Sequence, residues 1–102
     1  MESERKMQFV RKSLTAEELL IQLAEECAEL SQACLKIVRV SGNNPPKGNL
    51  RDLDASFTEE LADVQLCMAM LPHYMKDGEA IENIKEHKLN RSCNRLRGNW
   101  EE

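Results

Sequence analysis

Aromatic residues, long apolar runs and paired cysteine motifs are scarce in this 102-residue sequence, and each scarcity excludes a class of protein. Aromatic residues make up 4% of the chain and runs of β-branched residues are absent, so a strand-rich fold is not expected. No apolar run approaches the roughly 20 residues of a membrane-spanning helix. The polar start MESERK also lacks the apolar stretch of a signal peptide.

The four cysteines form no CxxC motif and do not cluster with histidine, which argues against a zinc site. Cys27, Cys34 and Cys67 lie at apolar positions of helical patterns, so we expect buried, reduced thiols in a cytoplasmic protein. The formal net charge of −4 argues against a general nucleic-acid binder. The sequence therefore predicts a protein with neither a membrane nor a nucleic acid as its partner.

The chain contains strong signals for helices. Residues 1–13 are mixed and charged, and we expect a short, frayed helical segment there. Thr15 followed by Glu18 forms a capping box, which opens a helix predicted to run to about Val40. The stretch SGNNPPKGN, residues 41–49, then predicts a loop, because glycine, proline and asparagine favour turns.

Two more helices are predicted after this loop. Ser56 and the glutamate three residues later form a second capping box, and Pro72 should kink or break the helix that follows. The Asp-Gly pair at 77–78 predicts a turn, followed by a third helix from about Glu79 to Leu96. The sequence thus predicts one all-α domain, residues 1–102, with three main helices.

Acidic residues flank the apolar face of the first long helix. At 100° per residue, Glu26 and Glu29 lie on one flank of that face, whereas Glu25 points towards water. This prediction takes the core-facing positions to be Leu20, Leu23, Cys27, Leu30 and Cys34.

The second helix repeats the arrangement. Glu60 and Asp63 lie on one flank of its predicted core line, which is Phe57, Leu61, Val64, Met68 and Leu71. If the helices pack as antiparallel neighbours, the two pairs of carboxylates meet. Four adjacent carboxylates repel one another unless a cation neutralises them, and Mg²⁺ or Mn²⁺ prefers such oxygen ligands. The alternative is four solvated surface acids. A di-iron site is not expected, because Glu-x-x-His motifs are absent.

Basic residues lie on the third predicted helix. Lys88, Arg91 and Arg95 continue the face that begins with Ile81 and Ile84, within an arc of about 80°. Cations beside a metal-binding cluster suit a phosphate-handling site, whereas the alternative is that they stabilise the helix dipole. Further candidates for the phosphate-binding role are two cations of the first long helix, Lys36 and Arg39.

The motif EECAE at 25–29, followed by EELAD at 59–63, resembles the EExxE…ExxD motif of the MazG-like all-α nucleoside triphosphate pyrophosphohydrolases. KLNRSCNR, residues 88–95, is similar to the basic third-helix segment of many members. The resemblance covers roughly residues 15–97. Departures from the family pattern are Pro72 and the long Pro/Asn-rich loop between the acidic motifs.

This resemblance implies a Mg²⁺-dependent hydrolase that cleaves the α–β phosphate bond of a nucleoside triphosphate, releasing a monophosphate and pyrophosphate. It implies metal binding by Glu26, Glu29, Glu60 and Asp63, with Glu26 and Glu29 as catalytic candidates and Glu29 as the one that orients or deprotonates the attacking water. Phosphate binding would fall to the basic residues of the third helix, Lys88, Arg91 and Arg95.

The resemblance also implies a helical bundle completed by a second subunit, as a dimer or tetramer. A wide apolar arc on the first long helix independently favours a homodimer, since it includes Ile21, Ala24, Ala28 and Leu35. Two alternatives to the main interpretation remain at this point. One is a non-catalytic regulatory or partner-binding module on the same scaffold, and the other is a hydrolase of another phosphorylated metabolite.

Overall fold

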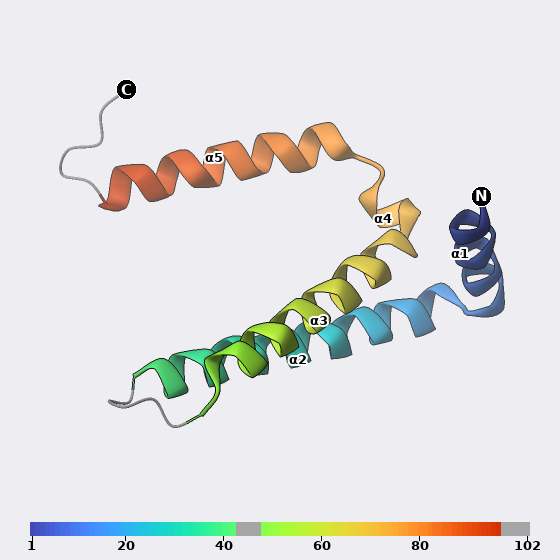
Figure 1. Ribbon diagram of the computed structural model, residues 1–102. Coiled ribbons are helices and arrows are strands. Elements are labelled where there is room, and N and C mark those ends of the chain that lie inside the picture. Colours follow the sequence, from blue (N-terminus) through green and yellow to red (C-terminus); the bar gives the residue numbers. More distant parts are fainter. Residues whose placement is uncertain (43–47, 97–102) are drawn as a thin grey trace. The chain divides into compact units, whose positions relative to one another are not determined.

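The computed structural model describes residues 1–42 and 48–96, and every regular element in these ranges is a helix (Figure 1). This confirms the all-α prediction. The elements are α1 (Glu2–Ser13), α2 (Ala16–Ser41), α3 (Leu50–Ala69), α4 (Pro72–Met75) and α5 (Gly78–Leu96). The chain divides into two compact units, Met1–Pro72 and His73–Glu102, and the acidic motifs lie in the first.

α2 begins where the sequence predicts. The backbone N–H of Glu18 donates to the Thr15 hydroxyl oxygen at 3.0 Å, and the N–H of Thr15 donates to the Glu18 carboxylate at 2.8 Å. These reciprocal bonds form the predicted capping box and satisfy two N–H groups that a helix end leaves free. α2 continues to Ser41, one residue beyond the predicted end. Residues 43–47 of the predicted loop lie outside the described residues.

The predicted second capping box is wrong. α3 begins at Leu50, and Ser56 lies inside the helix. The residue that caps it is Asn49, whose side-chain oxygen accepts hydrogen bonds from the N–H groups of Arg51 (3.0 Å) and Asp52 (3.4 Å). Asparagine is as effective an N-cap as serine, and no glycine or proline in residues 50–55 stops the helix from starting there.

α2 and α3 form an antiparallel hairpin and lie side by side along most of their length (Figure 1). The least exposed residues of each helix recur at alternating intervals of three and four, which is the heptad spacing of paired helices. On α2 these positions are Leu19, Leu23, Glu26, Leu30, Ala33, Ile37 and Val40. On α3 the positions with this spacing are Leu50, Leu53, Phe57, Glu60, Val64 and Cys67, and Leu61 and Asp63 beside them are also half-buried.

This packing face corrects the predicted core line of α2. Leu20, Cys27 and Cys34 are exposed in the chain, whereas Leu19 and Ala33 are buried. The cause is that α2 carries two apolar lines at heptad spacing, one residue apart. The line that contacts α3 passes through Glu26, so a count of apolar residues alone favours the wrong one. On α3, Met68 is likewise exposed, while Cys67 is buried as predicted.

The first unit has its apolar core at the end of the hairpin where α2 begins and α3 ends. Leu19, Met70 and Leu71 are buried there, and partly buried residues of α1 and of the following turn pack against them: Met7, Val10 and Leu14. The Arg11 guanidinium also donates a 2.8 Å hydrogen bond to the carbonyl oxygen of Ala69, at the end of α3. The predicted N-terminal segment is therefore a 12-residue helix that closes this end of the hairpin.

The second long helix breaks just before Pro72, where the sequence predicts a kink or a break. α3 ends at Ala69, and Pro72 opens the four-residue helix α4. α5 begins at Gly78, and the Asp77 carboxylate accepts a hydrogen bond from the N–H of Ala80 at 3.1 Å. None of the described helices combines the length and the apolar character that crossing a membrane requires.

Candidate metal centre

Glu26 and Glu60 occupy interface positions that the heptad spacing normally gives to apolar residues. Glu26 follows Leu23 by three residues on α2, and Glu60 follows Phe57 by three residues on α3. Both glutamates are half-buried, as is Asp63. Burial removes part of the water around a carboxylate, and this is unfavourable for the ionised form unless another group compensates.

The two helices bring three carboxylates together. One oxygen each from Glu26, Glu60 and Asp63 lies within 4.8 Å of the others. The Oε2 atoms of Glu26 and Glu60 are shielded from solvent and accept no hydrogen bond from a described residue. Buried polar atoms without partners are rare in folded proteins, because they lose hydration without compensation. These oxygens are therefore available to bind a cation.

The local electrostatics also favour a cation. Burial raises the pKa of Glu26, and the negative charges of Glu29 and Asp63 raise it further. Burial likewise raises the pKa of Glu60. A hydrogen bond with Glu29, the charge of Glu29 and the charges of Asp63 and Glu26 raise this pKa further. Each of these causes opposes ionisation. Because an ionised carboxylate has no proton to donate, this hydrogen bond favours the protonated form of Glu60.

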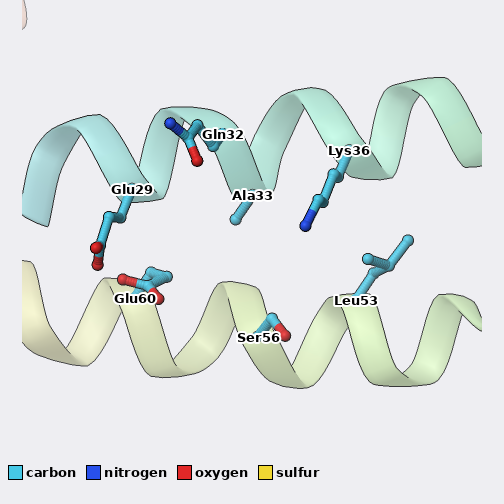
Figure 2. A pocket seen from close by; sticks show the side chains of 7 residues that line it. All are labelled: Glu29, Gln32, Ala33, Lys36, Leu53, Ser56 and Glu60. Atoms are coloured by element: carbon cyan, nitrogen blue, oxygen red, sulfur yellow. The ribbon is translucent and has the colours of Figure 1, made fainter.

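Glu29 lies at the edge of this group. Its side chain is exposed and is not one of the three whose oxygens converge. In Figure 2 its carboxylate extends from α2 towards Glu60 on α3. Glu29 raises the pKa of both Glu26 and Glu60, so it belongs to the same electrostatic cluster. The structure thus brings the predicted acidic residues into one neighbourhood, with Glu29 on the solvent side. The exposed neighbour of Glu26, Glu25, is outside this cluster.

A buried thiol borders the cluster. Burial raises the pKa of Cys67, and the nearby charges of Glu26, Asp63 and Cys27 raise it further. A thiol with a raised pKa stays protonated at neutral pH and is a poor metal ligand. The donors left in the cluster are carboxylate oxygens, which suit a hard cation such as Mg²⁺ or Mn²⁺. The residues present therefore fit the predicted metal.

A cavity of about 290 Å³ adjoins the acidic cluster between α2 and α3 (Figure 2). Glu29 and Glu60 line one end, and Lys36 with Leu53 lines the other. The remaining lining residues are Gln32, Ala33 and Ser56. The prediction from sequence named Lys36 only as a further phosphate-binding candidate and missed Gln32, Leu53 and Ser56. The sequence signal that indicates this cavity is Ala33, a small residue at a position that packs against the neighbouring helix.

The three basic residues predicted to bind phosphate lie on α5. Lys88, Arg91 and Arg95 are exposed there, Ile81 is half-buried and Ile84 is 55% exposed. These residues belong to the second compact unit, whereas the acidic cluster belongs to the first. The prediction that the cations and the acids form one site stays a prediction.

In comparisons with known proteins, no family model, no curated protein and no solved structure matches the chain.

Proposed function

We propose that this protein is a Mg²⁺-dependent nucleoside triphosphate pyrophosphohydrolase. It would hydrolyse the α–β phosphate bond of a nucleoside triphosphate to a nucleoside monophosphate and pyrophosphate. The resemblance of EECAE and EELAD to the MazG-like acidic motifs supports this reaction. The positions of these motifs support it as well, since they lie on adjacent helices with Glu26, Glu60 and Asp63 converging.

The observation that carries the proposal is the pair of unpartnered, buried oxygens of Glu26 and Glu60. Surface acids on a helix keep their hydration and need no partner, so solvated acids do not explain these atoms. A structural salt bridge does not explain them either, since no lysine or arginine within the described residues pairs with either glutamate. A divalent cation bound by carboxylates accounts for the burial, the convergence and the raised pKa values together.

The residues would divide the work as follows. Glu26, Glu60 and Asp63 would hold the metal, and Glu29 would be its fourth ligand, on the solvent side of the cluster. When bound, the metal would neutralise phosphate charge and lower the pKa of a bound water. Glu29 would orient the attacking water and accept its proton as the water oxygen bonds to phosphorus. The bridging P–O bond then breaks, and its electron pair leaves with the departing phosphate group.

The basic residues of α5 would bind the phosphate oxygens of the substrate. Lys88, Arg91 and Arg95 supply the donors and the positive charge that such oxygens require. Arg95 also lies in the last turn of α5, where cations are common for electrostatic reasons alone. Substituting Lys88 or Arg95 by methionine distinguishes the two roles. A substrate-binding role predicts a roughly ten- to hundred-fold lower kcat/KM, and a dipole role predicts normal kinetics with a lower Tm.

A second subunit would complete the bundle. Outside the line that packs on α3, α2 leaves four large apolar side chains exposed on the single chain: Leu20, Ile21, Leu35 and Val38. Apolar patches of this kind usually mark an interface. We expect a homodimer or tetramer, and light scattering at micromolar concentration measures its mass. A monomer mass would contradict this part of the proposal.

The reaction is tested with a panel of NTPs and dNTPs in the presence of Mg²⁺, identifying the products. We expect pyrophosphate and a monophosphate, and none from a Glu26→Gln variant at the same protein concentration. Glu25→Gln is the matched control, because Glu25 is the adjacent residue and is exposed. Orthophosphate as the product would indicate a different phosphohydrolase. No product from any nucleotide would overturn the proposed function and favour a non-catalytic module.

A further inference from the structure

The cavity beside the acidic cluster, hereafter called the slot, lies between α2 and α3. It starts at Glu29 and Glu60 and extends between α2 and α3 towards Lys36 (Figure 2). Ala33 and Ser56 project into the same stretch of the cavity, and their small side chains leave it open. A molecule held by its phosphates at the acidic cluster therefore has room to place its other end in this slot.

Lys36 supplies a free cation at the far end of the slot. It follows Glu29 by seven residues, which corresponds to about 10 Å along an α-helix. In Figure 2 its ammonium group points into the space between the helices. No described residue forms a hydrogen bond or an ion pair with this ammonium group. Its three N–H donors are thus available to acceptors on a ligand.

The walls of the slot suit a planar ring better than a further phosphate. Leu53 and Ala33 present apolar surface opposite and beside Lys36. A phosphate group needs several donors or cations, and the other charged residues lining the slot, Glu29 and Glu60, are acidic. A nucleotide base instead packs its flat faces against apolar side chains, and the polar atoms on its edge form hydrogen bonds with a few polar groups. The volume of about 290 Å³ is at the lower end of ligand pockets, which favours a single ring.

The donors of the slot distinguish between pyrimidines. The amide of Gln32 both donates and accepts, so it can turn to match either uracil or cytosine. In a pyrimidine nucleotide, ring position 4 lies opposite the nitrogen that carries the sugar, so a base whose phosphates lie at the acidic cluster presents position 4 to Lys36. The Lys36 ammonium only donates, so it pairs with the carbonyl oxygen that uracil and thymine carry at position 4 and cannot pair with the amino group that cytosine carries there. Uracil and thymine carry two ring carbonyl oxygens, whereas cytosine has an amino group in place of one of them.

From this geometry we propose that the slot binds the substrate's pyrimidine base, and that Lys36 selects uracil or thymine over cytosine. The proposal rests on the proposed function for the identity of the substrate as a nucleotide. Lys36 would be a specificity-determining residue, and the acidic cluster would act on the phosphates whichever base is bound.

The test compares kcat/KM for dUTP, dTTP and dCTP in the wild type and in Lys36→Met. We expect the wild type to prefer dUTP and dTTP by about ten- to hundred-fold, the factor of one charge-assisted hydrogen bond. Lys36→Met should lower kcat/KM for dUTP and dTTP by a similar factor and leave that for dCTP nearly unchanged. Lys12→Met is the control, since Lys12 is exposed on α1 and does not line the slot.

A binding measurement separates this proposal from the proposed function. UMP and CMP are titrated into the protein without catalysis, followed by NMR, in the wild type, Lys36→Met and Ser56→Leu. We expect UMP to bind more tightly than CMP, Lys36→Met to remove the difference, and Ser56→Leu to weaken both by filling the slot.

The outcomes are distinct. Pyrophosphate release with equal rates for all bases, or with a preference that survives Lys36→Met, would overturn the slot proposal and leave the function intact. A preference for purine nucleotides would overturn it too. UMP binding that depends on Lys36, without hydrolysis of any nucleotide, would support the slot and overturn the function. Neither hydrolysis nor UMP binding would overturn both.

Discussion

The end of the α2–α3 hairpin that α1 covers, here called the closed end, differs from the middle of the hairpin in the residues at equivalent heptad positions. At the closed end, Leu19 and Leu71 are 5% and 3% exposed and pack with Met70 against α1. In the middle, the same spacing places Glu26 and Glu60 against each other's helix. Leucines at the closed end stabilise the fold, whereas ionised carboxylates on the packing face in the middle of the hairpin destabilise it.

This difference separates the residues that hold the fold from those that perform chemistry. Capping, apolar packing and the Arg11–Ala69 hydrogen bond are concentrated where α2 begins and α3 ends. The carboxylates lie about two to three turns further along the helices, at 3.6 residues per turn, where the helices are already held side by side. Clustered acids are tolerated in the middle because another part of the same interface supplies the stability.

The largest expected effect is on the closed end. Leu71→Ala should lower the free energy of unfolding by about 2–5 kcal/mol, because it removes a buried side chain and leaves a cavity. Urea denaturation measures this loss. Leu96→Ala, at a position 85% exposed, is the matched control and should change the free energy by about 0.5 kcal/mol or less. Equal losses from both variants would show that the closed end is not the anchor of the fold.

The next effect concerns the middle of the hairpin. Glu60→Gln keeps the shape of the side chain and removes its charge, so it should lower kcat/KM by about 100-fold or more. A residue that only orients a metal ligand typically costs about 10- to 100-fold when it is substituted, so a larger loss indicates a direct ligand. It should not lower the Tm of the metal-free protein, because it relieves repulsion. Glu59→Gln changes the exposed neighbour and should leave both quantities nearly unchanged. Normal turnover in Glu60→Gln would remove Glu60 from the candidate metal centre.

A smaller effect is expected at the start of α2. Thr15→Ala removes the hydroxyl that accepts the hydrogen bond from Glu18, and it should cost about 1 kcal/mol of stability with kcat/KM retained. Thr58→Ala provides the matched control, because the Thr58 hydroxyl bonds only to the carbonyl of Asp54 within the same helix. If Thr15→Ala instead lowered activity at unchanged Tm, the separation between the two regions would fail.

The smallest effect is a dependence of stability on pH. In the folded protein the pKa values of Glu26 and Glu60 are raised above 4.5, so folding favours their protonated forms. Their contribution to stability is fully present below about pH 4.5, the unfolded value, and is lost as pH rises through the folded pKa. The metal-free protein should therefore have a higher Tm at pH 5.5 than at pH 7.5.

Two comparisons check the origin of this dependence. Glu60→Leu should reduce the difference in Tm between the two pH values, and Mg²⁺ should raise the Tm of the wild type more at pH 7.5 than at pH 5.5, because protons compete with the metal for the same oxygens. A Tm difference that is the same in Glu60→Leu as in the wild type would assign the pH dependence to other groups.

Local sequence signals predicted the helices well. The Thr15 capping box and the break near Pro72 depend on residues close in sequence, and both are present in the structure. The turn predicted at 77–78 lies one residue earlier, because Lys76 and Asp77 separate α4 from α5 and Gly78 is already helical. The start of α3 was predicted seven residues late, because two good N-caps, Asn49 and Ser56, compete and the sequence does not rank them. Elements that depend on a few neighbouring residues are the ones that a single sequence predicts best.

The sequence predicted which acidic residues form the candidate site, but it did not predict which face of each helix carries them. Periodicity paired Glu26 with Glu29 and Glu60 with Asp63, and the structure brings these acids together. It did not predict that Glu26 and Glu60 lie on the packing face itself, because apolar periodicity assumes that interface positions are apolar. The slot at Ala33 was missed for a related reason, since a cavity depends on which small side chains of two helices meet.

The heptad spacing of α2 also constrains how the length of this chain can change. One residue inserted between Glu26 and Leu30 would turn everything beyond it by about 100°, moving Ala33 and Lys36 away from α3. An insertion of seven residues would restore the face to within about 20°. Among homologous chains, α2 should therefore vary in length by whole heptads, with single-residue insertions and deletions confined to the segments that join the helices.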